Sequence, residues 1–374
     1  MQFSLGVAGC GKTTFMQEFL MDVYAGKFVT ITGPNPSVLL ASTTNSQCQA
    51  LYTLVLALHA NEESNVPKPL RWVVSQSFWD EAEVTGNDFV RRHATTKVPR
   101  PDKNTIVIYT HDSAAERNAG FWFNIVCLDE VGAIAHLQGA CIVGLATRMA
   151  KIMGDPLQGT LSVRSFAAVH AHYGPASDLQ FATRSLRCPN EIMKIVEPAY
   201  RDAFDEDLVI SGVPTDERPL SGVVQTTFSH TSIDAIRELC GEDLLIMGFT
   251  NRAIEEIPNA HTVDSAIGLE AAVAIVIFEK REDMRSHQYQ KTKLVPALTR
   301  CTNILIIMWM EGSWDTLLWT KTVDGRDIRL DGYEVLANIA DKRWIENPLQ
   351  FVQELRECSF GGSSFFSSGG RGRS

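Results

Sequence analysis

Short apolar runs recur along the chain, separated by longer segments in which the apolar residues have helical spacing. Six of these runs have the composition of buried strands: residues 38–41, 105–109, 123–128, 244–249, 273–278 and 304–308. Continuous apolar runs, in place of alternating ones, are typical of parallel sheets that helices cover on both faces. The pattern therefore predicts an α/β fold with parallel sheets.

The runs fall into two groups, one ending near Gly154 and the other beginning near Val223, with a less regular stretch between them. A length of 374 residues corresponds to two or three domains at about 150 residues each. Asn347 and Pro348 precede apolar residues with helical spacing, as an N-cap and a first helical residue do. We expect two α/β domains, an extension with this last helix, and a disordered tail rich in Gly, Ser and Arg.

The composition, with 45% hydrophobic and 21% charged residues, excludes a mostly disordered, collagen-like or coiled-coil chain. Lys and Arg number 34 against 44 Asp and Glu, a net charge of −10, so nucleic-acid binding must use a local groove rather than a global basic field. No apolar run approaches the roughly 18 residues of a membrane span. We therefore expect a soluble, intracellular protein without a membrane partner, cytoplasmic in location, with the nucleus also open.

The eight cysteines lie singly, without a C-x-x-C pair, which predicts reduced thiols, most of them in the core. His170 and His172 are the one close histidine pair in the sequence. Because no cysteine or carboxylate cluster of ligand spacing stands beside them, we expect no metal there.

Residues 6–13 read G-V-A-G-C-G-K-T, which matches the phosphate-binding pattern G-x-x-x-x-G-K-T. The apolar segment 3–5 precedes the loop and a helical pattern follows it, as the motif requires. Glycines let backbone N–H groups turn toward phosphates, the lysine reaches the β- and γ-phosphates, and a threonine hydroxyl ligates Mg²⁺. The loop predicts binding of a nucleoside triphosphate by Gly6, Gly9, Gly11, Lys12, Thr13 and Thr14.

Asp129 and Glu130 follow the apolar run 123–128, at the carboxyl end of a predicted strand. Beside a phosphate-binding loop, such a pair suits a magnesium ligand and a general base. We expect Asp129 to hold Mg²⁺ together with Thr13, and Glu130 to accept a proton from the attacking water. Since transfer to a second substrate does not ordinarily need this glutamate, the pair favours hydrolysis.

The segment K-I-M-G-D-P-L-Q-G at 151–159 adds a third element. With the phosphate loop and the acidic pair, it resembles the third motif of superfamily 1 helicases. The chain is most similar to the up-frameshift-like and nidovirus-helicase group, with alphavirus-like viral RNA helicases as a close neighbour. The resemblance implies that Gln158 senses the γ-phosphate.

Further segments extend the resemblance. V-L-L-A-S-T-T-N-S and T-I-V-I-Y-T-H-D-S-A-A resemble motifs that contact the nucleic-acid strand, which implies that role for Thr43, Thr44, Asn45 and Thr110. S-L-R-C-P-N-E-I resembles the motif that opens the second domain, and it implies that Arg187 contacts the γ-phosphate. T-V-D-S-A-I-G-L-E and P-A-L-T-R-C-T-N resemble motifs five and six, which implies strand contacts from Thr262 and Ser265, a nucleotide contact from Glu270, and a second phosphate-contacting arginine at Arg300.

The resemblance implies two RecA-like P-loop NTPase domains with parallel sheets, at 1–183 and 184–320, followed by an extension at 321–358 and a tail at 359–374. It implies an ATP-dependent helicase or translocase that uses Mg²⁺ and hydrolyses ATP in the interdomain cleft. The implied catalytic residues are Glu130, Gln158, Arg187 and Arg300. The implied partner is a single-stranded nucleic acid, RNA rather than DNA, and the sequence names no protein partner.

Three departures from the family pattern keep a second function open. The upstream glutamine motif that reads adenine has no counterpart, Ala133 stands where the up-frameshift-like pattern has glutamine, and Ile267 stands where motif five has a polar residue. These departures favour a degenerate helicase that binds ATP as a scaffold without productive unwinding. A non-helicase P-loop enzyme, such as a kinase, would leave the later motifs unexplained.

Aromatic and basic residues offer further candidates for nucleic-acid contact. Phe78, Trp79, Trp122 and Trp309 could stack on bases, although their apolar settings favour core packing. A basic cluster in the irregular segment before residue 105 fits phosphate contacts and a solvated loop face equally well: Arg91, Arg92, His93, Lys97, Arg100 and Lys103.

Overall fold

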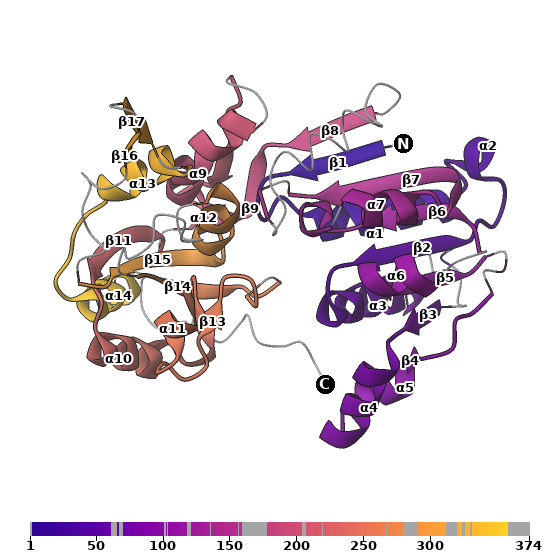
Figure 1. The fold of residues 1–374 in the computed structure, drawn as a ribbon, viewed down its shortest axis with the longest axis horizontal. Helices are drawn as coiled ribbons and strands as arrows, with labels where there is room; N and C mark the ends of the chain where they lie inside the picture. The colour runs from indigo at the N-terminus through magenta and orange to yellow at the C-terminus, as the bar shows by residue number, and fades with distance from the viewer. Residues whose placement is uncertain are drawn as a thin grey trace. The chain divides into compact units, whose positions relative to one another are not determined.

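The structure is a computed structural model. It describes residues 2–60, 66, 70–100, 102, 104–117, 121–134, 136–155, 157–158, 178–203, 207–218, 220–266, 268–279, 290–311, 320–323, 326–329 and 331–357. The chain divides into two compact units, one formed by Met1–Gly6 with Gly11–Ala182 and one by Val7–Cys10 with Thr183–Ser374. Each unit has a parallel sheet with helices packed against it (Figure 1).

The first unit is built on an eight-stranded sheet in the order β4-β3-β5-β2-β6-β7-β1-β8, with all neighbouring strands parallel. All five residues of β2 are buried, as expected for a strand covered on both faces. The strands are β1 Gln2–Gly6, β2 Val38–Ser42, β3 Leu70–Val73, β4 Ala94–Thr95, β5 Ile106–Thr110, β6 Phe123–Leu128, β7 Ala146–Gly154 and β8 Asp178–Ala182.

Helices of the first unit connect these strands and bury apolar residues against them. Met16, Leu20, Val55 and Leu58 from two of the helices belong to the same buried cluster as Ile108 of β5. The helices are α1 Lys12–Tyr24, α2 Val29–Thr32, α3 Asn45–Ala60, α4 Gln76–Thr85, α5 Asp88–His93, α6 His111–Arg117, the 3₁₀ helix η1 Val131–Ala133, and α7 His136–Val143.

The second unit contains a five-stranded parallel sheet in the order β11-β15-β14-β12-β13. Its strands are β11 Gly222–Thr227, β12 Leu244–Gly248, β13 His261–Thr262, β14 Ala271–Phe278 and β15 Cys301–Trp309. A parallel pair, β9 Arg184–Pro189 with β10 Ser211–Val213, and an antiparallel pair, β16 Thr320–Val323 with β17 Arg326–Arg329, form separate small sheets.

The helices of the second unit are α9 Asn190–Ala203, α10 His230–Cys240, the 3₁₀ helix η3 Gly241–Asp243, α11 Asn251–Ile254, α12 Lys291–Leu298, α13 Tyr333–Ala340 and α14 Pro348–Glu357. Val352 of α14 is fully buried in the same cluster as Ile275 of β14 and Ile306 of β15. The C-terminal helix therefore packs as part of the second unit.

All six predicted strand runs form strands, with end positions shifted by up to three residues. The last helix begins at Pro348 as predicted, and Asn347 caps it, because its Oδ1 accepts a hydrogen bond of 3.1 Å from Gln350 N. The stretch between the two groups of strands is more regular than predicted, since it holds β8, β9, α9 and β10. The strands in this stretch contain polar residues among the apolar ones, so a search for continuous apolar runs does not detect them.

No helix in the described part of the chain is long and apolar enough to cross a bilayer. Seven cysteines lie within the described residues as thiols, and all but Cys141 are buried, as predicted. His170, His172 and the tail at 359–374 lie outside the described residues.

Candidate active site

Most of the residues predicted for ATP and nucleic acid in the first unit lie at one edge of its sheet. In a parallel sheet the carboxyl ends of all strands meet at the same edge. There β1 ends at Gly6 before the phosphate loop, β6 delivers Asp129, and β7 delivers Asp155. At the same edge β2 delivers Thr43, and β5 ends at Thr110. The topology thus gathers motifs that are far apart in the sequence.

The phosphate loop has the backbone conformation for which its glycines were expected. Gly9 and Gly11 adopt φ values of 69° and 87°, in the left-handed region that residues with a Cβ rarely enter. Gly11 is followed directly by α1, so the helix begins at Lys12, and Thr13 and Thr14 are exposed in its first turn. A helix N-terminus with exposed hydroxyls and a lysine is suited to hold phosphate groups.

Two contacts of the loop were not foreseen. Val7–Cys10 packs with the second unit, where Ala8 N donates a 3.1 Å hydrogen bond to the hydroxyl of Tyr200 and Leu186 N donates one of 2.8 Å to Gly9 O. Tyr200 is completely buried in α9. A buried tyrosine on an amphipathic helix gives no sequence signal of such a contact.

The acidic pair has an unusual backbone. Glu130 adopts φ 55° and ψ 48°, a left-handed conformation that costs a non-glycine residue about 1 kcal/mol or more and is concentrated at functional sites. Its N–H donates a 3.0 Å hydrogen bond to Asp129 Oδ1, while Asp129 N donates one of 2.8 Å to Ala41 O on β2.

Burial and the Glu130 carboxylate raise the pKa of Asp129, while the Lys12 ammonium opposes the shift. A buried carboxylate of this kind suits a divalent cation, whose charge would stabilise its ionised form. The described residues contain no group of three His, Cys, Asp or Glu side chains that could form an all-protein metal site. Since Mg²⁺ at phosphates takes one or two protein ligands and keeps several waters, Asp129 and the Thr13 hydroxyl fit the ion.

Gln158 lies in a turn that Asp155 organises. Asp155 Oδ1 accepts a 2.9 Å hydrogen bond from Leu157 N, and its carbonyl accepts one of 3.0 Å from Gln158 N. The Gln158 residue is only 5% exposed, and its buried Nε2 makes no hydrogen bond with any of the described residues. A buried amide donor without a partner is costly, so this donor, which has none among the described residues, suits a ligand acceptor such as a phosphate oxygen.

Gly132 allows the acidic turn and the Gln158 turn to touch. A Cβ atom on Gly132 would lie 2.4 Å from Gln158 O and 2.5 Å from Asp155 O, closer than real contacts of this kind. Sequence reasoning missed this glycine, although it lies two residues after Glu130. A glycine beside a catalytic turn is the signal that could have suggested a close approach.

His111 is a second residue that the sequence did not single out. It is 3% exposed at the start of α6. Burial lowers the pKa of His111 to about 4, and hydrogen bonds with the backbone of Asp129 and Ala41 oppose that shift. A neutral histidine therefore supports the backbone of the acidic strand end from the neighbouring helix.

Two of the residues expected to contact nucleic acid, Thr44 and Thr110, cap helices. Thr44 and Gln47 form a reciprocal cap on α3, in which Gln47 N donates to Thr44 Oγ1 at 3.2 Å and Thr44 N donates to Gln47 Oε1 at 3.1 Å. Thr110 Oγ1 accepts a 3.4 Å hydrogen bond from Ser113 N. Thr43 Oγ1 and Asn45 Oδ1 are buried atoms that make no hydrogen bond with the described residues, which leaves them able to bind a strand.

The second unit brings three predicted nucleotide-contacting residues to neighbouring segments. Arg187 lies on β9, and its Nε forms a 2.5 Å ion pair with Oε2 of Glu270. Arg300 lies between α12 and β15 and is 3% exposed. Thr262 and Ser265, which were predicted to contact the nucleic acid, bind each other: Thr262 Oγ1 donates a 3.0 Å hydrogen bond to Ser265 Oγ. Ile267 lies outside the described residues.

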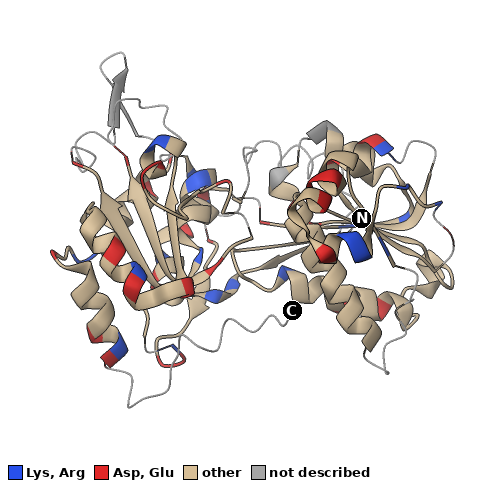
Figure 2. Cartoon of the chain, turned by 90° about the horizontal axis from the view of Figure 1, so that it is seen from below, with Lys and Arg blue, Asp and Glu red and all other residues tan. Residues whose placement is uncertain are grey.

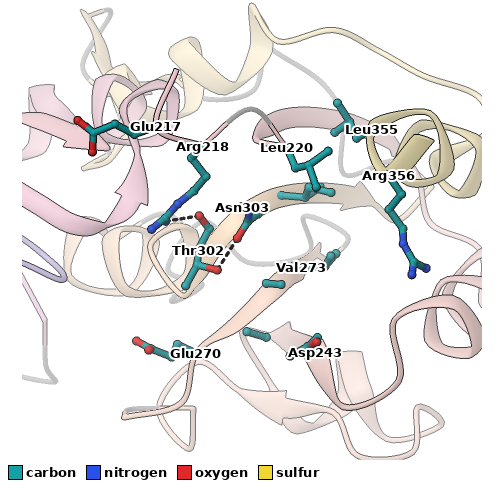
Figure 3. A pocket seen from close by; sticks show the side chains of 13 residues that line it. Glu217, Arg218, Leu220, Asp243, Glu270, Val273, Thr302, Asn303, Leu355 and Arg356 are labelled. Carbon is teal, nitrogen blue, oxygen red and sulfur yellow. Dashed lines mark hydrogen bonds between the residues drawn. The ribbon is translucent and has the colours of Figure 1, made fainter. Parts of the chain in front are cut away.

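A cavity of about 430 Å³ opens beside Glu270, at the amino ends of β14 and β15 (Figure 3). Ala271, Val273 and Ile304 give it apolar lining, while its polar lining includes Arg218, Asn303 and Arg356. Glu270 thus stands both beside Arg187 and at a cavity.

Two expectations about aromatic and basic residues need correction. Trp309 is buried and Phe78 and Trp79 pack against the core, as favoured, but Trp122 is 62% exposed, because it precedes β6 and is not part of it. The basic cluster does not begin in an irregular segment, since α5 contains Arg91, Arg92 and His93.

Both arginines of α5 lie 3.8 Å from Asp88, and His93 packs on Phe89 with ring centroids 4.7 Å apart. Lys97 and Arg100 are exposed, and Lys103 lies outside the described residues. Acidic and basic residues are interspersed on both units (Figure 2).

Two parallel-sheet units, one with a phosphate loop beside an acidic pair, define an α/β protein of the P-loop class. The chain belongs to the family of viral superfamily 1 RNA helicase core domains, whose model matches residues 84–309. The sequence-based prediction of superfamily 1 is thereby confirmed. No curated protein matches the chain in sequence.

The fold is similar to that of an arterivirus helicase, nonstructural protein 10, with a TM-score of 0.50 and 14% identity, over 82% of this chain and 59% of that chain. A structure of arterivirus nonstructural protein 10 (helicase) with DNA matches with a TM-score of 0.45 and 13% identity, over the same shares of the two chains. This chain thus spans 59% of the length of these two solved helicases. The likeness to the first of these structures confirms the predicted α/β fold.

Proposed function

We propose that the chain is the ATP-hydrolysing motor of a superfamily 1 helicase and that it moves along single-stranded RNA. One observation carries the proposal: the acidic turn of Asp129 and Glu130 packs through Gly132 against the turn of Gln158, at the sheet edge where the phosphate loop begins. Family membership supports RNA over DNA as the strand. Cytoplasmic location is part of the proposal, with the nucleus as the alternative.

Each side chain has a distinct task in this mechanism. The loop amides and Lys12 bind the phosphates of ATP. Thr13 and Asp129 would hold Mg²⁺, which would neutralise phosphate charge. Glu130 accepts the proton of the attacking water while the Gln158 amide donates to the γ-phosphate. Arg187 and Arg300 of the second unit stabilise the charge that develops on the transferring phosphoryl group.

Strand contacts are proposed for Thr43, Asn45 and the hydroxyl donors of Thr44, Thr110, Thr262 and Ser265. The hydroxyls of Thr44 and Thr110 accept capping hydrogen bonds and can still donate their own protons. Thr262 and Ser265 would exchange the hydrogen bonds that they donate to each other for contacts with the strand. Such contacts go to phosphate and sugar, and they position the strand without reading its sequence.

The test is steady-state ATP hydrolysis with and without single-stranded RNA or DNA. Stimulation by RNA that Lys12→Ala and Glu130→Gln both abolish is the expected result. Glu130→Gln should retain ATP binding, because it removes the base and leaves the phosphate loop intact, whereas Lys12→Ala should weaken binding itself.

A degenerate scaffold is the second candidate, and Ala133 at the end of η1 favours it, because no hydrogen-bonding side chain stands there. ATP binding that depends on Lys12, without hydrolysis under any strand condition, would establish the scaffold in place of the motor. Stimulation of ATP hydrolysis by DNA alone would support the motor function, with single-stranded DNA in place of RNA as the strand along which it moves.

A further inference from the structure

Arg218 joins the two segments that carry the phosphate-contacting arginines. Its Nη1 donates hydrogen bonds to the backbone carbonyl of Arg187 and to that of Thr302, two residues after Arg300. Figure 3 shows the guanidinium reaching Thr302 at the end of the cavity. One guanidinium nitrogen carries two N–H groups, so it can bind both carbonyls at once.

Both carbonyls lie where the regular strand ladder is interrupted. The pairing of β9 with β10 shifts register between Arg184 and Pro189, and Arg187 lies inside that shift. The pairing of β14 with β15 shifts between Cys301 and Ile304, so Thr302 lies in a bulge. Such interruptions leave the segment to be fixed by side chains, and they are common beside functional sites.

A second link connects the same two segments. The Cys188 thiol donates a 3.3 Å hydrogen bond to Thr299 O, immediately before Arg300. Burial raises the pKa of Cys188 to about 11, so the sulfur keeps the proton that it donates. Arg218 and Cys188 therefore make two separate links between the segment of Arg187 and the segment of Arg300. The links reach the second segment on either side of Arg300, at Thr302 and at Thr299.

We propose that Arg218 is a positioning residue, which fixes the backbone segments of Arg187 and Arg300 relative to each other so that both guanidinium groups meet the γ-phosphate together. The inference rests on the proposed ATP hydrolysis. Arg218 acts through the backbone of both arginines and does not itself contact the nucleotide. A misplacement of about 1 Å in a catalytic group can cost about 100-fold in rate.

The experiment compares Arg218→Ala and Arg218→Lys with Arg184→Ala as the matched control. Arg184 lies on β9 together with Arg187, is exposed, and pairs at 3.6 Å with Glu217, the neighbour of Arg218. We expect Arg218→Ala to lower kcat about 10- to 100-fold while the Kd for ATP changes less than about threefold, since the phosphate loop is untouched. Arg218→Lys keeps the charge and the donors but loses the planar fork, so it should restore part of the rate.

A double-mutant cycle separates positioning from simple folding support. In an Arg187→Ala/Arg300→Ala background, the further loss of Arg218 should lower kcat less than about twofold, because nothing remains to be positioned. An undiminished further loss in that background would overturn the proposal. So would a lowered melting temperature with unchanged kcat per folded molecule.

Hydrogen exchange tests the same inference without activity. In the nucleotide-free protein, Arg218→Ala should speed amide exchange in the segments 184–189 and 299–304 together, while Arg184→Ala leaves segment 299–304 unchanged. Unchanged exchange in both segments would refute the role of Arg218. If the parent chain fails to hydrolyse ATP, the proposed function falls, and the exchange measurement still decides whether Arg218 joins the segments.

Discussion

Arg187 and Glu270 form a 2.5 Å ion pair within the second unit, and the side chains are 23% and 49% exposed. The sequence resemblance implied that both residues contact the nucleotide, Arg187 at the γ-phosphate and Glu270 elsewhere. It did not indicate that the two side chains bind each other. Partly exposed pairs contribute about 0–1 kcal/mol. Arg187 can therefore exchange the carboxylate for a phosphate at little cost.

The ion pair leads to unequal effects of removing its two members. Glu270→Gln should change the KM for ATP by less than about fivefold, since it removes at most about 1 kcal/mol. Arg187→Ala should lower kcat by about 1000-fold, as expected for an arginine that stabilises the transferring phosphoryl group. Steady-state kinetics of both variants provide the measurement, and equal losses in kcat would contradict the assignment.

Gly132 gives a prediction that the motif patterns do not contain. Gly132→Ala places a Cβ 2.4 Å from Gln158 O, so the acidic turn and the Gln158 turn must separate. We expect kcat to fall more than about tenfold and the melting temperature to fall by several degrees.

The matched control is Gly139→Ala in α7, where the new Cβ would meet Ile134 at an ordinary 3.5 Å. That variant should keep its rate. Thermal melting and ATP hydrolysis of the two alanine variants make the comparison, and a fully active Gly132→Ala protein would show that the two turns need not touch.

The strands and the strand-end motifs were predictable because their signals are local. An apolar run such as 123–128 followed by Asp129 and Glu130 carries both the strand and its chemistry in eight consecutive residues. The phosphate loop, with Gly11 and Lys12, is equally compact. The order of the strands within the sheet was not foreseen, because it depends on pairings between segments far apart in the chain.

What escaped the sequence are contacts made across long separations. Arg218, Tyr200 and Gly132 act on backbone atoms, and any residue type offers the same carbonyl and amide to them. Trp122 was misassigned for a related reason, since an aromatic residue beside an apolar run has the same sequence signal whether it precedes the strand or lies in it.

Thr43 and Thr44 are adjacent but should respond differently to substitution. Thr43 Oγ1 is a buried atom without a hydrogen bond to the described residues, so Thr43→Val removes an unsatisfied group and should leave stability unchanged or slightly raised. Thr44 caps α3, so Thr44→Ala should cost about 1 kcal/mol of stability.

Both substitutions should weaken RNA binding, Thr43→Val by about three- to tenfold, as for one lost hydrogen bond. Chemical denaturation and fluorescence titration with a single-stranded RNA measure the two properties separately. Loss of stability without loss of RNA affinity in Thr43→Val would remove this residue from the strand contacts.

Gln225 is the polar centre of the contact between β11 and the C-terminal segment. Its Nε2 donates to Ala340 O at 3.1 Å and to Lys342 O at 2.6 Å, and its Oε1 accepts a 3.2 Å hydrogen bond from Trp309 Nε1. The residue is 2% exposed. Leucine has nearly the same volume but cannot make any of these hydrogen bonds, so Gln225→Leu should lower the free energy of unfolding by about 3 kcal/mol, at about 1 kcal/mol for each bond.

The expected loss in the free energy of unfolding arises because Gln225 is buried. An exposed glutamine therefore serves as the control. Gln350 lies on α14, where its Nε2 donates to Glu354 Oε1 at 2.7 Å on the surface. Gln350→Leu should change the free energy of unfolding by less than about 0.5 kcal/mol. Urea denaturation followed by tryptophan fluorescence reports both variants, and it places a probe at the contact because Trp309 is the Gln225 partner. Equal midpoints for the two variants would mean that the C-terminal segment is held by its apolar contacts and not by Gln225.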